Sequence, residues 1–253
     1  MNCGLYKQAP FRRAAGAEFR PGGLRLTGEL AAACGLRPGE RVLDLACGIG
    51  STASYLSQAY GVRATGLDSS PELLGEAGVR DGSAEWTLGS ADALPFPDAW
   101  FDAVFAECFL SGCADKSTVL SEVRRVLRPC GRLAVSDMYL REPGAAPKGA
   151  GIPAATCLSG AIGKDATLAV FDQAGFTVAL WEDRSEGLKT LMASLIMEYG
   201  SAAAFWEAAA GEDEDGDAVS ASAAAARGAA LAAARPGYYL LLATSGLCGP
   251  RRV

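Results

Sequence analysis

Two cysteines and a glutamate lie in the stretch FAECFLSGCADK, where an apolar run ends and a polar, helix-starting segment begins. The side chains in this stretch that could take part in chemistry are Glu107, Cys108 and Cys113. The chain has eight cysteines and no histidine, so the side chain that most often acts as a general base near neutral pH is missing. Any chemistry must therefore use other groups.

A glycine-containing loop, LDLACGIGSTA, follows an apolar strand and opens a helix. Gly48 and Gly50 allow the backbone to approach a ligand closely, with helix N–H groups beyond them. Asp68 follows Gly48 by 20 residues, where an acid can bind ribose hydroxyls. The pattern fits two ligands, a nicotinamide dinucleotide or S-adenosylmethionine.

The carboxylate of Asp44, inside the strand just before the glycines, distinguishes these ligands. It would repel a pyrophosphate, whereas it would attract a ligand that carries an ammonium and a sulfonium. The structural alternatives are a buried acid satisfied by backbone N–H groups for Asp44 and a helix N-cap for Asp68. We therefore favour S-adenosylmethionine, and keep an NAD-dependent oxidoreductase and a non-catalytic cofactor-binding sensor as alternatives.

The elements that must position these residues follow from the apolar pattern. Runs of strand length alternate with amphipathic stretches of helix length, which is typical of a parallel sheet covered by helices. We expect strands over residues 41–47, 62–68, 84–92, 101–107, 132–140, 177–183 and 237–245. We expect the main helices over residues 51–60, 70–80, 117–128 and 164–176.

The domain organisation is predicted to be a single domain over residues 1–253. An N-terminal cap helix is expected within 1–40, a Rossmann-like core over 41–185 and a helical insertion over 186–236, before the last strand at 237–245. The insertion contains the acidic segment GEDEDGD at 211–217, which is most simply a solvated loop.

Composition excludes several classes of function. The net charge of -6, without clustered Lys and Arg, argues against a nucleic-acid partner. No apolar run approaches the roughly 20 residues of a membrane span, so we predict no membrane association and a cytoplasmic location. In that compartment the cysteines are expected to be reduced, and the absence of CxxC pairs argues against a structural metal site.

Four stretches of the chain resemble successive motifs of the class I S-adenosylmethionine-dependent methyltransferases. They are RVLDLACGIG, ATGLDSSPELL, GSADALPFPDAWFDAVFAE and VLSEVRRVLRPCGRLAVSD. The resemblance implies an α/β fold with a Rossmann-like, doubly wound, seven-stranded sheet that is mostly parallel with an antiparallel last strand. It implies S-adenosyl-L-methionine as cofactor and a predicted binding set of Asp44, Ala46, Gly48, Gly50, Asp68, Ser69, Ser90, Ala91, Asp92 and Glu107.

The roles within this set are also implied by the resemblance. The segment from Asp44 to Gly50 would hold the methionine part and Asp68 the ribose, while Ser90, Ala91 and Asp92 would hold the adenine. Ser90 departs from the family's usual aspartate, so Asp92 or a backbone group is expected to take over the adenine amine.

Within the family, the segments around Cys108 and Cys157 are most similar to arsenite methyltransferases. That resemblance implies Cys108 and Cys157 as ligands of trivalent arsenic. Glu107, where those enzymes have Asn, is included in the predicted catalytic set, and Cys113 is a candidate third thiol if the loop after the fourth strand folds back. Trivalent arsenic is soft and prefers thiolates, as soft metals do. Held by sulfurs, it keeps a lone pair that can attack a methyl group.

A small organic molecule is the alternative acceptor. Glu107 adds a negative charge beside Cys108, which would raise the pKa of the thiol and disfavour its thiolate. For a carbon, nitrogen or oxygen nucleophile, Glu107, Asp137 or Tyr139 would accept the proton. The N-terminal segment, with Tyr6 and Arg20, is expected to cover the cofactor.

Overall fold

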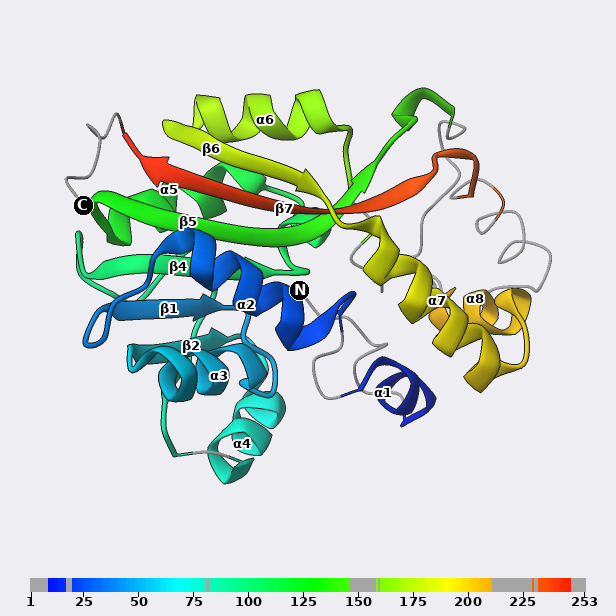
Figure 1. Ribbon diagram of the computed structural model, residues 1–253, viewed down its shortest axis with the longest axis horizontal. Coiled ribbons are helices and arrows are strands. Elements are labelled where there is room, and N and C mark those ends of the chain that lie inside the picture. Colours follow the sequence, from blue (N-terminus) through cyan, green and yellow to red (C-terminus); the bar gives the residue numbers. More distant parts are fainter. Residues whose placement is uncertain are drawn as a thin grey trace.

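The fold is a single twisted sheet with helices on both faces (Figure 1). The computed structural model describes residues 9–16, 20–80, 82–145, 158, 160–210, 229 and 232–246. Its strands are β1 (Arg41–Leu45), β2 (Arg63–Asp68), β3 (Glu85–Leu88), β4 (Phe101–Glu107), β5 (Leu127–Leu140), β6 (Phe176–Asp183) and β7 (Pro236–Ser245). They are arranged in the order β3-β2-β1-β4-β5-β7-β6.

The strand directions confirm the predicted fold class. Strands β1 to β5 pair in parallel, while β7 runs antiparallel to both β5 and β6. The order reverses at β1 and β4, whose carboxyl ends therefore flank the crevice where ligands of open α/β sheets bind. Glu107 and the loop after Leu45 lie at this point.

One predicted boundary is wrong. The helix expected over 117–128 ends at Val126, and β5 begins at Leu127 rather than at 132. Leu127 pairs with Phe101 of β4, and Arg128 precedes Pro129, which disfavours a helical conformation. Because of this pairing with β4 and the following proline, the chain is already in an extended conformation five residues before the predicted start of the strand.

Five helices cover the two faces of the sheet. On one face, α5 (Lys116–Val126) and α6 (Lys164–Gln173) pack Leu120, Val123 and Phe171 against the strands. On the other, α2 (Gly23–Cys34) and α3 (Ser51–Tyr60) contribute Leu26, Leu30 and Leu56 to a second core. Helix α4 (Pro71–Arg80) lies beside β2 and β3. Short 3-10 helices are formed by Leu110–Gly112 and Pro143–Ala145.

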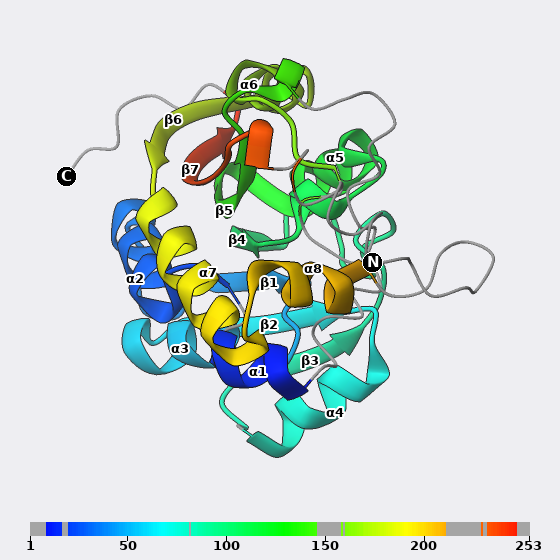
Figure 2. The same ribbon diagram turned by 90° about the vertical axis from the view of Figure 1, so that its right-hand side faces the viewer.

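Three further helices lie over the carboxyl edge of the sheet, which faces the viewer in Figure 2. They are α1 (Ala9–Ala15), α7 (Ser185–Tyr199) and α8 (Ala202–Ala210), and they share an apolar cluster of Phe11, Leu195 and Phe205. Helices α7 and α8 lie in the segment predicted to be a helical insertion before the last strand. The acidic segment 211–217 lies outside the described residues.

The N-terminal part contains two helices instead of the one expected. Pro21 and Gly22 precede α2, and Gly22, its N-cap, has a left-handed φ of 74°. Glycine adopts this conformation without the penalty that other residues incur. Helix α1 is thereby free to lie against α7, while α2 packs on the sheet.

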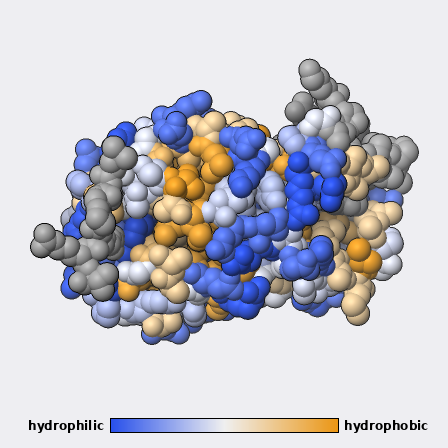
Figure 3. All heavy atoms as spheres, turned by 45° about the horizontal axis from the view of Figure 1, so that its top comes forward, coloured by the Kyte–Doolittle hydropathy of each residue, from blue (hydrophilic) through white to orange (hydrophobic). Residues whose placement is uncertain are grey.

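The outer surface is mainly polar on the face seen in Figure 3, where a narrow band of hydrophobic side chains separates hydrophilic areas. Among the described residues, no helix combines the length and the apolar character needed to cross a bilayer. Cys34, Cys47, Cys108 and Cys113 are thiols, as predicted. Cys130 is disulfide-bonded, which corrects the expectation that the cysteines are all reduced.

Arg132 of β5 fastens the end of α2 to the sheet, and its replacement should destabilise the fold. It donates to the carbonyls of Cys34 at 2.9 Å and Gly35 at 3.0 Å, and pairs with Glu40 at 2.6 Å. Arg132→Met should lower the free energy of unfolding by about 3–5 kcal/mol, as expected when one partner of a buried ion pair is removed. Urea denaturation measures this.

The matched control for that variant is Arg235→Met, which removes an exposed arginine paired with Glu142. It should change the free energy of unfolding by less than about 1 kcal/mol. Equal losses in the two variants would contradict the role assigned to Arg132.

Candidate functional site

The loop between β1 and α3 is held against the end of β2. The backbone N–H of Cys47 donates to the carbonyl of Leu67 at 3.0 Å, and that of Gly48 donates to Asp68 Oδ2 at 2.8 Å. Ala46 and Gly48 both have left-handed φ values, 58° and 55°. This conformation turns the chain sharply at the end of β1, so the loop crosses the carboxyl edge of the sheet.

Asp68 is not the N-cap of the following helix. Ser70 takes that role, since its Oγ accepts from Leu73 N at 3.3 Å. The second carboxylate oxygen of Asp68 accepts from Ser70 N at 2.9 Å. Each carboxylate oxygen has a further lone pair, so Asp68 can still accept hydrogen bonds from a ligand's hydroxyls.

A cavity of about 400 Å³ opens beside this loop. Its lining includes six of the predicted cofactor residues, Ala46, Asp68, Ser69, Ser90, Ala91 and Asp92. The cavity is within the size range of pockets that hold a nucleoside-sized ligand. The structure thus brings together residues from the ends of β1, β2 and β3.

The loop after β4 forms the opposite wall of the cavity through Phe109, Gly112 and Cys113. Sequence reasoning did not assign these residues to the cofactor site. Cys113 was considered there only as a third thiol, but its Sγ donates to the carbonyl of Phe109 at 3.5 Å. Burial raises the pKa of the Cys113 thiol to about 11, so it stays protonated at neutral pH.

Glu107 lies at the centre of a buried polar cluster and not in the lining of the cavity. Its carboxylate accepts from Thr27 Oγ1 at 3.0 Å, Thr52 Oγ1 at 2.6 Å and Ser136 Oγ at 3.1 Å. It also pairs with the Arg20 guanidinium at 3.0 Å. These donors occupy most of its acceptor positions, so Glu107 is a structural anchor rather than an available base.

Sequence reasoning missed the hydroxyl partners of Glu107. Thr27 comes from α2, Thr52 from the first turn of α3 and Ser136 from β5, and all three are buried. A buried Thr or Ser within an amphipathic helix or apolar strand gives no distinct signal, because its partner is far away in sequence. Arg20 was predicted near the cofactor, and the structure places it in this cluster.

Asp44 adds a second carboxylate to the same region. It is 3% exposed and accepts from Ala53 N at 3.0 Å. Burial, together with the charge of Glu107, raises the pKa of Asp44 to about 7. Two buried carboxylates therefore lie near the buried guanidinium of Arg20, which pairs directly with Glu107.

Cys108 follows Glu107 in a left-handed conformation, with φ of 53°. It is 8% exposed, its N–H donates to the Ser136 carbonyl at 2.7 Å, and its side chain belongs to the apolar core on the α2 face. Cys157, its predicted partner, lies outside the described residues. Across the part of the chain that the structure describes, no group of three His, Cys, Asp or Glu residues has the arrangement of a metal site.

Asp137 and Tyr139, the other predicted proton acceptors, are engaged in the fold. Asp137 is fully buried and accepts from the backbone N–H groups of Ser111 at 2.8 Å and Met138 at 2.7 Å. Burial raises the pKa of Asp137 to about 6. Tyr139 donates to Asp183 at 2.6 Å. Asp137 thus anchors the loop after β4, which forms the cavity wall.

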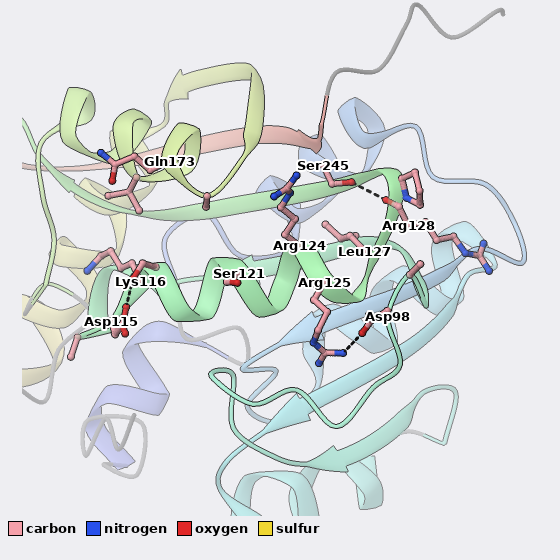
Figure 4. A pocket seen from close by; sticks show the side chains of 16 residues that line it. Asp98, Asp115, Lys116, Ser121, Arg124, Arg125, Leu127, Arg128, Gln173 and Ser245 are labelled. Atoms are coloured by element: carbon pink, nitrogen blue, oxygen red, sulfur yellow. Dashed lines mark hydrogen bonds and ion pairs between the residues drawn. The ribbon is translucent and has the colours of Figure 1, made fainter.

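A second hollow of about 990 Å³ lies along the outer face of α5 (Figure 4). Its charged side chains are largely committed to partners in the fold. Arg125 pairs with Asp98, as Figure 4 shows. Arg128 pairs with Asp102, and Asp115 caps α5 through Thr118 N. The glycine loop and Asp68 do not line it, so we place the cofactor in the smaller cavity.

The Glu107 cluster should be sensitive to loss of its charge. Glu107→Gln keeps the shape of the side chain but removes the charge that balances buried Arg20. We expect the free energy of unfolding to fall by about 3 kcal/mol or more, since an ion in a buried pair loses its counter-charge. Glu198→Gln is the control, because its pair with Arg13 is exposed to solvent. If both variants unfold at the same urea concentration, the cluster is not an anchor.

Asp44 predicts the pH dependence of cofactor binding. Its carboxyl is ionised above pH 7 and protonated below, so affinity for the cationic S-adenosylmethionine should fall as pH drops from about 8 to about 6. The sign is opposite for the stability of the ligand-free fold. Because the pKa of Asp44 is higher in the folded than in the unfolded protein, a protonated Asp44 stabilises the ligand-free fold. This contribution to the free energy of unfolding is lost as the pH rises through about 7.

Titration calorimetry of S-adenosylmethionine at several pH values measures this effect. Asp44→Asn should bind more weakly at pH 8 and lose most of the pH dependence. The exposed Asp98→Asn is the control and should behave as the native protein does. A native affinity that is independent of pH between 6 and 8 would contradict the assignment.

Comparison with known proteins agrees with this geometry. Residues 43–135 match the model of a methyltransferase domain. The O-methyltransferase resE of Aspergillus sclerotiorum is 35% identical over 122 residues, which are 46% of this chain and 46% of that protein. The 2-phytyl-1,4-naphtoquinone methyltransferase of Synechococcus elongatus is 42% identical over 111 residues, or 41% and 48% of the two chains. This chain thus spans about half the length of the curated relatives it matches.

A solved structure extends the similarity to most of the fold. The [4+2]-cyclase SpnF is 27% identical with a TM-score of 0.68, and the alignment covers 88% of this chain and 81% of that one. The strand order, the glycine loop and the matched segment agree with one another. The match of residues 43–135 to a methyltransferase domain therefore agrees with the strand order and with the glycine loop after β1.

Proposed function

We propose that this protein transfers the methyl group of S-adenosylmethionine to a small organic acceptor. The observation that carries the proposal is the pair of buried carboxylates at the switch point of the sheet, Asp44 and Glu107, of which Glu107 pairs with the guanidinium of Arg20. Such a site favours a cationic ligand and disfavours a pyrophosphate. This charge pattern also argues against the NAD-dependent alternative.

The acceptor class is supported by the relatives and by the helices over the site. The curated relatives described above are named for an O-methyl transfer and for a naphthoquinone substrate. Helices α1, α7 and α8 cover the carboxyl edge through the cluster of Phe11, Leu195 and Phe205. These three helices limit the space beside the cofactor and favour a small, partly apolar acceptor.

The chain contributes mainly orientation to the reaction. When bound, S-adenosylmethionine supplies an electrophilic methyl group, and Asp68 would hold its ribose hydroxyls while Asp44 would face its positive charge. Glu107 and Asp137 are both engaged by donors from the fold, so neither is assigned the acceptor's proton. Alignment of two reactants and exclusion of water can contribute about 7–11 kcal/mol to lowering a barrier.

Arsenite remains the more specific prediction, and its support is narrower. Cys108 does lie at the carboxyl end of β4, as that prediction requires. However, its thiol is buried in the apolar core, and its left-handed backbone fits a residue that shapes the wall of the site. We therefore propose the organic acceptor first.

A reaction other than methyl transfer is the second candidate. SpnF, with 27% identity to this chain, is named as a [4+2]-cyclase. A protein of this fold therefore carries the name of a reaction other than methyl transfer. The candidate predicts S-adenosylmethionine binding without formation of S-adenosylhomocysteine.

One assay separates these proposals. The purified protein is incubated with S-adenosylmethionine and a panel of phenols, quinols, amines and arsenite with thiol, and S-adenosylhomocysteine is quantified. We expect turnover with an organic acceptor. Cofactor binding without turnover on any member would refute the methyltransferase proposal, and turnover only with arsenite would replace the acceptor.

The Cys108→Ser variant tests the thiol directly. If Cys108 is a wall residue, turnover of the organic acceptor should stay within about threefold of the native value, since serine is nearly isosteric and no covalent step uses the sulfur. Ala53→Ser is a matched control for a new hydroxyl at a buried position on the same face. Loss of turnover by more than a hundredfold in Cys108→Ser alone would assign the thiol to the reaction.

A further inference from the structure

The indole of Trp86 lies beneath the glycine loop. Trp86 is on β3 and pairs in register with Gly66 of β2. A Cβ placed on Gly66 would lie 2.6 Å from Trp86 Cζ3, and one placed on Gly50 would lie 2.1 Å from Cη2. Both distances are shorter than side chains tolerate, so the ring occupies space that only glycine at both positions leaves open.

The two halves of the loop have different supports. The first half is fixed by hydrogen bonds from Cys47 N to Leu67 and from Gly48 N to Asp68. The second half, at Gly50, donates a hydrogen bond to the Cys47 carbonyl at 2.9 Å, has a left-handed φ of 77° and packs on the six-membered ring of the indole. It leads directly into α3, whose Ala53 N–H holds Asp44 and whose Thr52 hydroxyl holds Glu107.

The shape of the indole, and not its polar atom, accounts for tryptophan at this position. Its Nε1 is buried and has no hydrogen-bond partner among the residues that the structure describes. An unpaired buried donor is unfavourable, and phenylalanine would avoid it. The benzo ring of tryptophan, however, reaches Gly50, which the shorter phenylalanine ring would not.

We propose that Trp86 is a positioning residue for the cofactor. Its indole fixes the position of the second half of the glycine loop relative to the sheet. Because this part of the loop leads into α3, the indole also positions the groups that hold Asp44 and Glu107. This inference rests on S-adenosylmethionine as the cofactor of residues 43–135, and it is independent of the acceptor. Trp86 does not line the cavity, so it acts through the loop.

The test compares Trp86→Phe and Trp86→Ala with Trp100→Phe. Trp100 is 39% exposed and has the Arg41 guanidinium 3.8 Å from its ring centroid, away from the loop. Binding of S-adenosylhomocysteine is measured by calorimetry without any acceptor. We expect about a fivefold loss of affinity in Trp86→Phe, equivalent to about 1 kcal/mol, and a larger loss in Trp86→Ala.

Two further readouts distinguish positioning from general destabilisation. The KM for S-adenosylmethionine should rise in Trp86→Phe while kcat at saturating cofactor stays unchanged, and its melting temperature should stay close to the native value. The change of tryptophan fluorescence on cofactor binding should disappear in Trp86→Phe and persist in Trp100→Phe.

The proposal is overturned if Trp86→Phe binds S-adenosylhomocysteine with native affinity, whether or not Trp86→Ala folds. A native protein that binds no S-adenosylhomocysteine would instead refute the cofactor. Binding with no methyl transfer to any acceptor would bear on the proposed reaction and leave this comparison intact.

Discussion

The buried carboxylate of Glu107 is the interaction on which the site depends. It joins four elements, because its partners come from the segment before α2, from α2, from the first turn of α3 and from β5. Burial of a charge is unfavourable unless hydrogen bonds and a counter-ion satisfy it, and here Arg20 and three hydroxyls do so. With Asp44 nearby, the cluster still has one carboxylate more than its guanidinium balances.

The glycine loop converts this charge pattern into a binding site. Asp68 holds the loop from one side and the Trp86 indole supports it from below, so the backbone stays close to the edge of the sheet. Asp137 does the same for the loop after β4, which forms the other wall of the cavity. Two of the strand-end segments that line the pocket, those after β1 and β4, are thus each fixed by a buried acid.

Much of this arrangement was predictable from local pattern. The strand and helix periods predicted the α/β sheet, and Asp44, Gly48 and Asp68 lie where their spacing suggested. The start of β5 was missed because pairing of Leu127 with Phe101 and the effect of Pro129 overrode helical periodicity. The hydroxyl partners of Glu107 were missed because they lie 29, 55 and 80 residues away in sequence, and contacts at such separations follow no recognisable spacing. Cytoplasmic location and the absence of a nucleic-acid partner stay predictions.

The central claim is that a cationic cofactor completes the charge balance at Asp44, and proton exchange on binding tests it most directly. Calorimetric titration of S-adenosylmethionine at pH 7, in buffers of different ionisation enthalpy, counts the protons released. With the pKa of Asp44 near 7 in the ligand-free protein, about half a proton should leave per cofactor bound, and none in Asp44→Asn. Binding without proton release, or equal release in both proteins, would contradict the account.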